Sequence, residues 1–124
     1  MNLQTTVLGF TALGVIVFVI YYTFSSPYKV SSEKAKRLLS EGKIDIVLDV
    51  RTKMEYDLGH YPEAVHLPTA ILSEEVETVI PDKEASILIY CNTGQRSRWA
   101  TDVLRKKGYK NVVYITGPYW SLLR

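Results

Sequence analysis

The sequence has no charged side chain in its first 28 residues and one cysteine among its 124 residues. A single cysteine excludes an intramolecular disulfide and any metal site built from several cysteines, and it fits a reducing compartment. Fifteen Lys and Arg against 13 Asp and Glu leave a formal net charge of +2. We therefore expect no nucleic-acid partner, and the length favours one folded domain.

The charge-free segment contains a long hydrophobic run over residues 7–24. With residues 3–6 the run reaches about 20 residues, which is enough to cross a bilayer as a helix. A cleaved signal peptide is the alternative, since Thr23 and Ser25 suit a cleavage site, but the run is long and lacks a basic segment before it. The pattern predicts a transmembrane anchor and linker over residues 1–28 and a domain over residues 29–124.

Basic residues follow the hydrophobic run, and the flanking acidic residue is Glu33. The cations are Lys29, Lys34, Lys36 and Arg37. The positive-inside rule then predicts a single-pass membrane protein with its C-terminal domain on the cytoplasmic side and the lipid bilayer as a partner. The same cations also suit the solvated face of a first domain helix.

Helical and strand patterns alternate after the linker. Helices are expected from residue 31 or 32 to 40, over 71–80 and from 97 onward, and strands over 44–50, 64–67, 87–90 and 112–115. This order indicates an α/β fold with a parallel sheet covered by helices on both faces. In the helix from residue 97, Trp99 shares a face with Ala100, Val103 and Leu104, so we expect it in the core.

Cys91 directly follows the apolar run 87–90, which suits a strand buried on both faces. Ser97 is a suitable N-cap for the helix that follows. Cys91 is therefore expected at the carboxyl end of a strand, where open α/β sheets bind ligands. Loop amides, the helix N-terminus and Arg96 would all stabilise a thiolate there. The alternative is a buried, structural cysteine.

The segment Cys-Asn-Thr-Gly-Gln-Arg-Ser at 91–97 resembles the active-site loop of rhodanese-like domains, C-x-x-G-x-R-S. Residues 48–51, 55–56, 59–62, 64 and 67–68 resemble the first signature of that family, and residues 107–112 resemble the stretch after its active-site helix. The resemblance covers residues 30 to 120. Two positions depart from it: Glu63 stands where glycine is usual, and Gly117-Pro118 where a glycine pair is usual.

The resemblance implies a rhodanese-like fold and a thiosulfate sulfurtransferase that carries sulfur as a persulfide on Cys91. It implies no cofactor and no metal. The donor would be a small sulfur anion such as thiosulfate, or a persulfide, and the acceptor cyanide or a thiol, including a protein thiol. The loop would bind the substrate through Asn92, Thr93, Gly94, Gln95, Arg96 and Ser97. Structural support would come from Asp49, Arg51, Glu55 and His60.

The spacing within the loop separates two kinds of chemistry. Four residues lie between Cys91 and Arg96, whereas cysteine phosphatases and arsenate reductases of the related fold have five, which wrap a tetrahedral oxyanion. A shorter ring of amides suits a single sulfur atom, so sulfur transfer is favoured. A non-catalytic persulfide carrier remains an alternative.

Glu55 lies four residues after Arg51, a spacing that predicts an ion pair on a helix.

Overall fold

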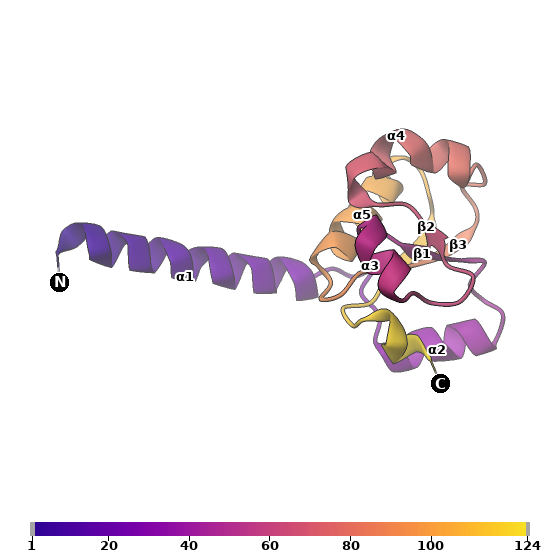
Figure 1. The fold of residues 1–124 in the computed structure, drawn as a ribbon, viewed down its shortest axis with the longest axis horizontal. Helices are drawn as coiled ribbons and strands as arrows, with labels where there is room; N and C mark the ends of the chain where they lie inside the picture. Colours follow the sequence, from indigo (N-terminus) through magenta and orange to yellow (C-terminus); the bar gives the residue numbers. More distant parts are fainter. Residues whose placement is uncertain (1, 124) are drawn as a thin grey trace.

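The computed structural model describes residues 2–123, and it consists of one long helix that projects from an α/β unit (Figure 1). The helices are α1 (Leu3–Phe24), α2 (Ser32–Ser40), α3 (Lys53–Leu58), α4 (Thr69–Val79) and α5 (Gln95–Lys106), the strands are β1 (Ile46–Asp49), β2 (Val65–His66), β3 (Ser86–Tyr90) and β4 (Asn111–Tyr114), and a 3₁₀ helix (Tyr119–Leu122) follows. Within the described residues the sheet is wholly parallel, in the order β2-β1-β3-β4.

Side chains of β3 alternate between two hydrophobic clusters. Ile87 and Ile89 pack with residues of α4 and α5, whereas Leu88 and Tyr90 pack with residues of α2 and the 3₁₀ helix. Figure 1 shows these helices on opposite faces of the sheet. A strand buried on both faces must be apolar at successive positions. The predicted parallel sheet covered on both faces is therefore confirmed.

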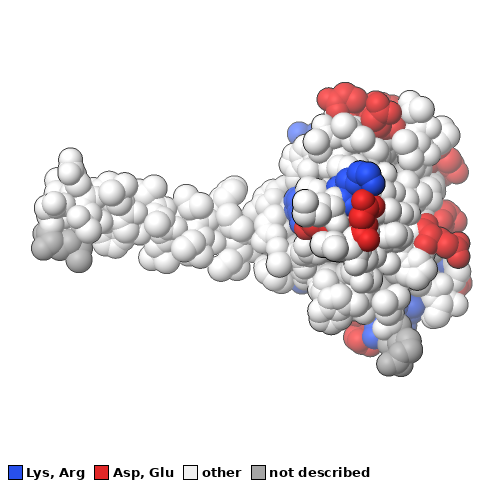
Figure 2. Space-filling view, in the orientation of Figure 1, with Lys and Arg blue, Asp and Glu red and all other residues white. Residues whose placement is uncertain are grey.

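Helix α1 is exposed along most of its length and has a mean hydropathy of 2.2 over an 18-residue window. It is long and apolar enough to cross a membrane, and 6% of that window is buried in the protein. The core helix of a soluble protein would instead be mostly buried. Figure 2 shows no red or blue side chain along α1, in contrast to the α/β unit. The helix is a candidate membrane span.

The last turn of α1 packs against the α/β unit. Thr23 is fully buried, and the Tyr114 hydroxyl donates a hydrogen bond of 2.7 Å to its carbonyl oxygen. Arg98 of α5 donates to the Tyr22 carbonyl, and its guanidinium carbon lies 4.3 Å from the centre of the Tyr22 ring. These contacts fix the end of the helix beside α5.

Each predicted segment lies within two residues of an observed helix or strand at each end, whereas α3 was not predicted. Two predictions about α5 are wrong. The helix begins at Gln95 with Gly94 as N-cap, so Ser97 lies inside it rather than capping it. Gly94 has φ +105°, which lets the chain turn into the helix early. Trp99 is 39% exposed and not in the core, because the buried face of α5 is centred on Ser97, Ala100, Thr101 and Leu104 and Trp99 lies at its edge.

Candidate active site

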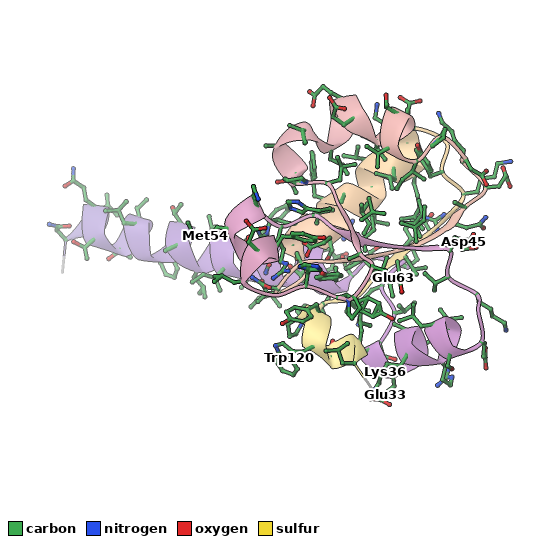
Figure 3. All side chains as sticks on the ribbon, turned by 45° about the vertical axis from the view of Figure 1, so that its right-hand side comes forward. Glu33, Lys36, Asp45, Met54, Glu63 and Trp120 are labelled. Carbon is green, nitrogen blue, oxygen red and sulfur yellow. The ribbon has the colours of Figure 1, made fainter. Side chains whose placement is uncertain are left out.

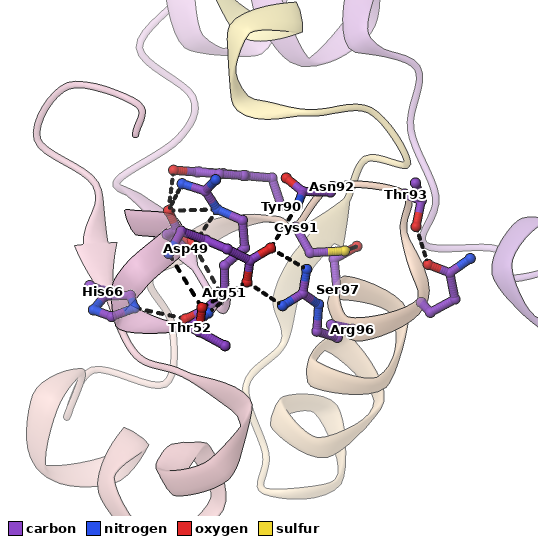
Figure 4. A network of polar contacts seen from close by, with 12 residues as sticks. Asp49, Arg51, Thr52, His66, Tyr90, Cys91, Asn92, Thr93, Arg96 and Ser97 are labelled. Carbon is purple, nitrogen blue, oxygen red and sulfur yellow. Dashed lines mark hydrogen bonds and ion pairs between the residues drawn. The ribbon is translucent and has the colours of Figure 1, made fainter. Parts of the chain in front are cut away.

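Cys91 lies directly after β3, and its thiol is 1% exposed. Its Sγ accepts a hydrogen bond of 3.1 Å from the Gly94 N–H and lies 3.6 Å from Ser97 Oγ (Figure 4). Ser97 Oγ is itself held by the carbonyl oxygens of Gly94 and Ile115, both 3.1 Å away. The sulfur is therefore fixed between the loop amide and the first turn of α5.

Gly94 allows the close packing around this loop. A Cβ atom at Gly94 would lie 2.8 Å from side-chain methyl groups of both Thr23 and Thr116. Together with the left-handed φ of +105°, this contact makes glycine the residue that fits. The end of α1 thus lies directly against the loop that holds Cys91.

The first turn of α5 presents amide donors that precede the hydrogen bonds within the helix. The first bond into the helix runs from the Arg98 N–H to the Gly94 carbonyl at 2.9 Å, so the N–H groups of Gln95, Arg96 and Ser97 precede it. Such amides and the positive end of the helix form an anion-binding position. Among the described residues, the Gly94 amide is the loop amide that contacts Sγ directly.

Glu55 of α3 links two residues of the Cys91 loop. Its carboxylate accepts two hydrogen bonds from the Arg96 guanidinium, at 2.7 and 3.0 Å, and one from the side-chain amide of Asn92 at 2.7 Å. The Arg96 bonds, assisted by Thr52, lower the pKa of Glu55 to about 2 against the effect of its burial. The pKa of Arg96 is raised, chiefly by Glu55 and to a smaller extent by Cys91. Arg96 therefore stays cationic beside the thiol.

The predicted ion pair between Arg51 and Glu55 is wrong. Arg51 instead turns back onto Asp49, with Nη2 2.7 Å from the carboxylate, and donates to the Gly59 carbonyl at 2.6 Å. The Tyr90 hydroxyl donates to the same carboxylate at 2.5 Å. Burial and this carboxylate raise the pKa of Tyr90. All three side chains are buried, so they form an internal support under the loops that follow β1 and β3.

The two histidines lie on either side of the Tyr56 ring. His60 stacks at 3.7 Å between ring centres and places Nδ1 2.8 Å from the Tyr56 carbonyl. His66 stacks at 4.3 Å and places Nε2 2.8 Å from the Arg51 carbonyl. Neither set of contacts involves Cys91. These rings fix the segment between β1 and β2.

The remaining loop residues lie nearer to solvent. Thr93 is exposed and donates a hydrogen bond to the Gln95 side chain. Gln95 and Arg96 also line a pocket of about 400 Å³ together with Thr69, Ala70 and Trp99. The sequence reasoning missed the contribution of α4 and of Trp99 to this pocket, and it missed Tyr90 as a support. In residues 2–123 no cluster of three or more His, Cys, Asp or Glu side chains is placed to hold a metal ion.

Comparison with known proteins gives a consistent result. The family model described as "Rhodanese-like domain" matches residues 31–119. Thiosulfate sulfurtransferase PspE of Escherichia coli is 34% identical over 65 residues, which cover 52% of this chain and 62% of that protein. The tRNA uridine(34) hydroxylase of Sodalis glossinidius is 32% identical over 76 residues, covering 58% of this chain and 22% of that protein. The chain thus spans under two thirds of either relative.

Solved structures show the same fold. The human single-domain sulfurtransferase TSTD1 superposes with a TM-score of 0.68 at 24% identity, covering 79% of this chain and 96% of the human one. A structure described as rhodanese with anions from E. coli gives a TM-score of 0.56 at 30% identity and covers 61% and 88% of the two chains.

Proposed function

The chain belongs to the rhodanese-like sulfurtransferase family, and on this basis we propose that it is a membrane-anchored sulfurtransferase that carries sulfur as a persulfide on Cys91. One observation carries the proposal: the Cys91 sulfur accepts the Gly94 amide at the start of α5, beside an arginine held by Glu55. A cation and main-chain donors favour a thiolate and an anionic terminal sulfur at the same place.

The first half-reaction loads the cysteine. The Cys91 thiolate attacks the outer sulfur of thiosulfate and forms a new S–S bond, while the original S–S bond breaks and sulfite leaves with its electron pair. The terminal sulfur keeps one negative charge and is stabilised by the amides of residues 92–97. Arg96 attracts the anionic donor, and its two hydrogen bonds to Glu55 hold the guanidinium in place.

The second half-reaction discharges the cysteine. Cyanide or a thiolate attacks the terminal sulfur, the S–S bond to Cys91 breaks, and Cys91 leaves as a thiolate ready for another cycle. Thiocyanate is released when cyanide is the acceptor, and a new persulfide when a thiol is the acceptor. No cofactor enters either step. Asp49, Arg51 and His60 act at a distance by fixing the loops.

Burial of the thiol favours a second candidate. Because Cys91 is 1% exposed, a donor reaches its sulfur only when loop residues move aside. That requirement suits a carrier that opens on contact with one dedicated protein partner. A carrier would form the same persulfide but would not turn over with small molecules.

The membrane part of the proposal rests on α1 and on the cations that follow it. Residues 1–28 would form the anchor and linker, and residues 29–124 the catalytic domain. Lys29 is the first charge after the span, and the basic residues of α2 follow it. The excess of cations on this side would keep the domain in the cytoplasm.

Steady-state assay of the full chain in detergent with thiosulfate and cyanide tests the enzyme. We expect thiocyanate to accumulate over many turnovers, and Cys91→Ser to form none. Ser97→Ala keeps the thiol and serves as a variant of the same loop, with a reduced rate. Formation of the Cys91 persulfide, detected by mass, without accumulation of thiocyanate would instead identify the carrier.

A further inference from the structure

The pocket beside the Cys91 loop is larger than a small sulfur anion needs. It measures about 400 Å³ and lies where the first turns of α4 and α5 meet, with Thr69 and Ala70 on one side and Gln95, Arg96 and Trp99 on the other. Thiosulfate and cyanide are small, charged and well hydrated. A roomy pocket adjoining the nucleophile's loop therefore points to a substrate with an additional group.

The wall of the pocket is mainly apolar, and polar groups of two lining side chains bond to residues outside the pocket. The Arg96 guanidinium is turned to Glu55 by two hydrogen bonds, and the Gln95 amide oxygen accepts from Thr93. The surface that these side chains and their neighbours expose to the pocket is mainly carbon. Ala70 adds a methyl group, and Trp99 adds a large ring that is 39% exposed. Such a wall gains free energy by covering hydrocarbon.

The exposure of Trp99 is not explained by packing. The buried positions of α5 are Ser97, Ala100, Thr101 and Leu104. Trp99 lies at the edge of this face, so its ring borders the pocket and does not fill the core. Aromatic rings left at the edge of an apolar pocket are frequent ligand contacts.

The pocket also lies on the side of the molecule that carries the candidate membrane span. Arg98, the residue before Trp99, contacts Tyr22 in the last turn of α1. Figure 1 shows α5 beside the end of α1, and Figure 3 shows Met54 and Trp120 on that side of the α/β unit and Asp45 on the far side. An apolar compound dissolved in the bilayer would therefore meet this side first.

We propose that this pocket binds the hydrocarbon group of the sulfur acceptor, and that the acceptor is a membrane-partitioning alkyl or aryl thiol. The proposal rests on the proposed function and adds a substrate class to it. The thiolate of the acceptor attacks the terminal sulfur of the Cys91 persulfide and forms a new S–S bond, and Cys91 leaves as a thiolate. The product is the hydrocarbon persulfide, and the net charge is unchanged.

The test uses the full chain in phosphatidylcholine nanodiscs. The chain is loaded with thiosulfate, the persulfide is verified by mass, and discharge by straight-chain thiols from ethanethiol to hexanethiol is timed. We expect the rate constant to rise about tenfold or more along the series, because each added CH₂ buries hydrocarbon. In Trp99→Ala the rise should be largely lost. Trp120→Ala removes an exposed tryptophan outside the pocket, and the rise in rate constant along the series should persist in this variant.

Partitioning into the bilayer concentrates longer thiols equally for every variant, so the comparison between variants isolates the pocket. The same rise in Trp99→Ala as in the unaltered chain, or no rise in either, would overturn the proposal. Hydrocarbon binding is also measured without chemistry, in Trp120→Phe, where Trp99 is the remaining tryptophan. Saturable quenching of its fluorescence by bromohexane supports the pocket even if loading fails, and non-saturable quenching argues against it.

Discussion

Glu55 is the residue on which the geometry of the Cys91 loop depends most directly. It binds Arg96 and Asn92 on the loop, and it closes a capping box with Thr52 at the start of α3. One carboxylate therefore fixes the loop cation and anchors the loop to the segment after β1. Its side chain is 28% exposed, so the pair with Arg96 is shielded from solvent better than a surface ion pair.

Replacing Glu55 by Gln tests this role with little change in shape. Glutamine also completes a capping box, so α3 should persist, but the charge-assisted pair of hydrogen bonds to Arg96 is lost. We expect persulfide loading by thiosulfate to slow by about tenfold, a loss typical of a displaced positioning group. Loading is measured by stopped-flow or quenched mass analysis. Asp57→Asn removes an exposed carboxylate from the same helix, and an equal loss in that control would refute the assignment.

The lowered pKa of Glu55 also predicts how stability depends on pH. The ordinary value is 4.5 and the folded value is about 2, so the carboxylate stabilises the fold above pH 4.5 and loses this effect as the pH falls toward 2. After allowance for solvent screening the effect is about 1–2 kcal/mol. Thermal unfolding of the unaltered chain and of Glu55→Gln should differ at pH 6 and converge near pH 2. A gap that is constant with pH would contradict the assignment.

Glu63 has a backbone conformation that favours glycine. Its φ is +65°, and its side chain is exposed in the turn before β2. Holding a residue with a Cβ in the left-handed conformation costs about 1 kcal/mol relative to glycine. Glycine recovers only part of this, because its unfolded chain has more conformational entropy to lose on folding. Glu63→Gly should therefore raise the free energy of unfolding by about 0.5 kcal/mol. Glu74→Gly, on an exposed face of α4, should lower it by about 1 kcal/mol. Denaturant titration of both variants measures the two signs, and destabilisation by Glu63→Gly would be the contrary result.

Sequence reasoning placed Cys91 at the end of its strand but did not find most of its partners. Glu55 and Arg96 are 41 residues apart, and the spacing of Arg51 and Glu55 suggested a local pair instead. The local rule failed because Asp49 and the Gly59 carbonyl, both close to Arg51, engage its guanidinium. Contacts between distant segments depend on the packed fold, which spacing along the chain does not encode.

At the scale of elements, α1 and α5 meet at the Cys91 loop. Thr23 packs on Gly94, and Arg98 reaches back to Tyr22. The start of α5 is therefore held from two directions, by α3 through Glu55 and by α1 through Arg98. Movement of α1 should therefore change the position of the loop.

Arg98→Ala removes one of these contacts. The guanidinium donates a hydrogen bond to the Tyr22 carbonyl of α1 and lies over the Tyr22 ring, and it forms an ion pair with Asp102 within α5. We expect hydrogen exchange of the amides at 92–98 to speed up by about tenfold, which corresponds to about 1.4 kcal/mol of local opening. The control is Arg37→Ala on the exposed face of α2. Exchange at 92–98 that is unchanged in Arg98→Ala would show that α1 does not restrain the loop.

The hydrophobic pattern of the sequence predicted which segments are helices and which are strands, but it did not predict the residue at which α5 begins. Strands such as β3 are predictable because burial on both faces demands an apolar run. Serine is a favoured N-cap, so Ser97 was the reasonable choice, yet Gly94 is the N-cap and Ser97 Oγ donates toward carbonyl oxygens instead. Ala100 and Leu104 of the predicted apolar face are buried as expected, whereas Trp99 lies at the edge of that face and is 39% exposed. Periodicity identifies a helix face but not its edge, and a residue at the edge is buried or exposed according to the neighbouring elements.

At the scale of the whole molecule, the α/β unit and α1 form an asymmetric shape (Figure 1). The strands run toward the side that carries α1, because Cys91 follows β3 and its loop touches Thr23. The fold class was predictable from the alternation of helices and strands. The position of the candidate span against the Cys91 loop was not, since it depends on Gly94, Thr23 and Thr116 coming together from three segments.

The central claim is that Cys91 carries one additional sulfur atom. The most direct measurement is intact mass of the full chain in detergent after treatment with thiosulfate and removal of excess donor. The account predicts a gain of one sulfur atom that cyanide removes and that Cys91→Ser never acquires. No gain in mass from thiosulfate or from a glutathione persulfide, with the chain folded by circular dichroism, would contradict it.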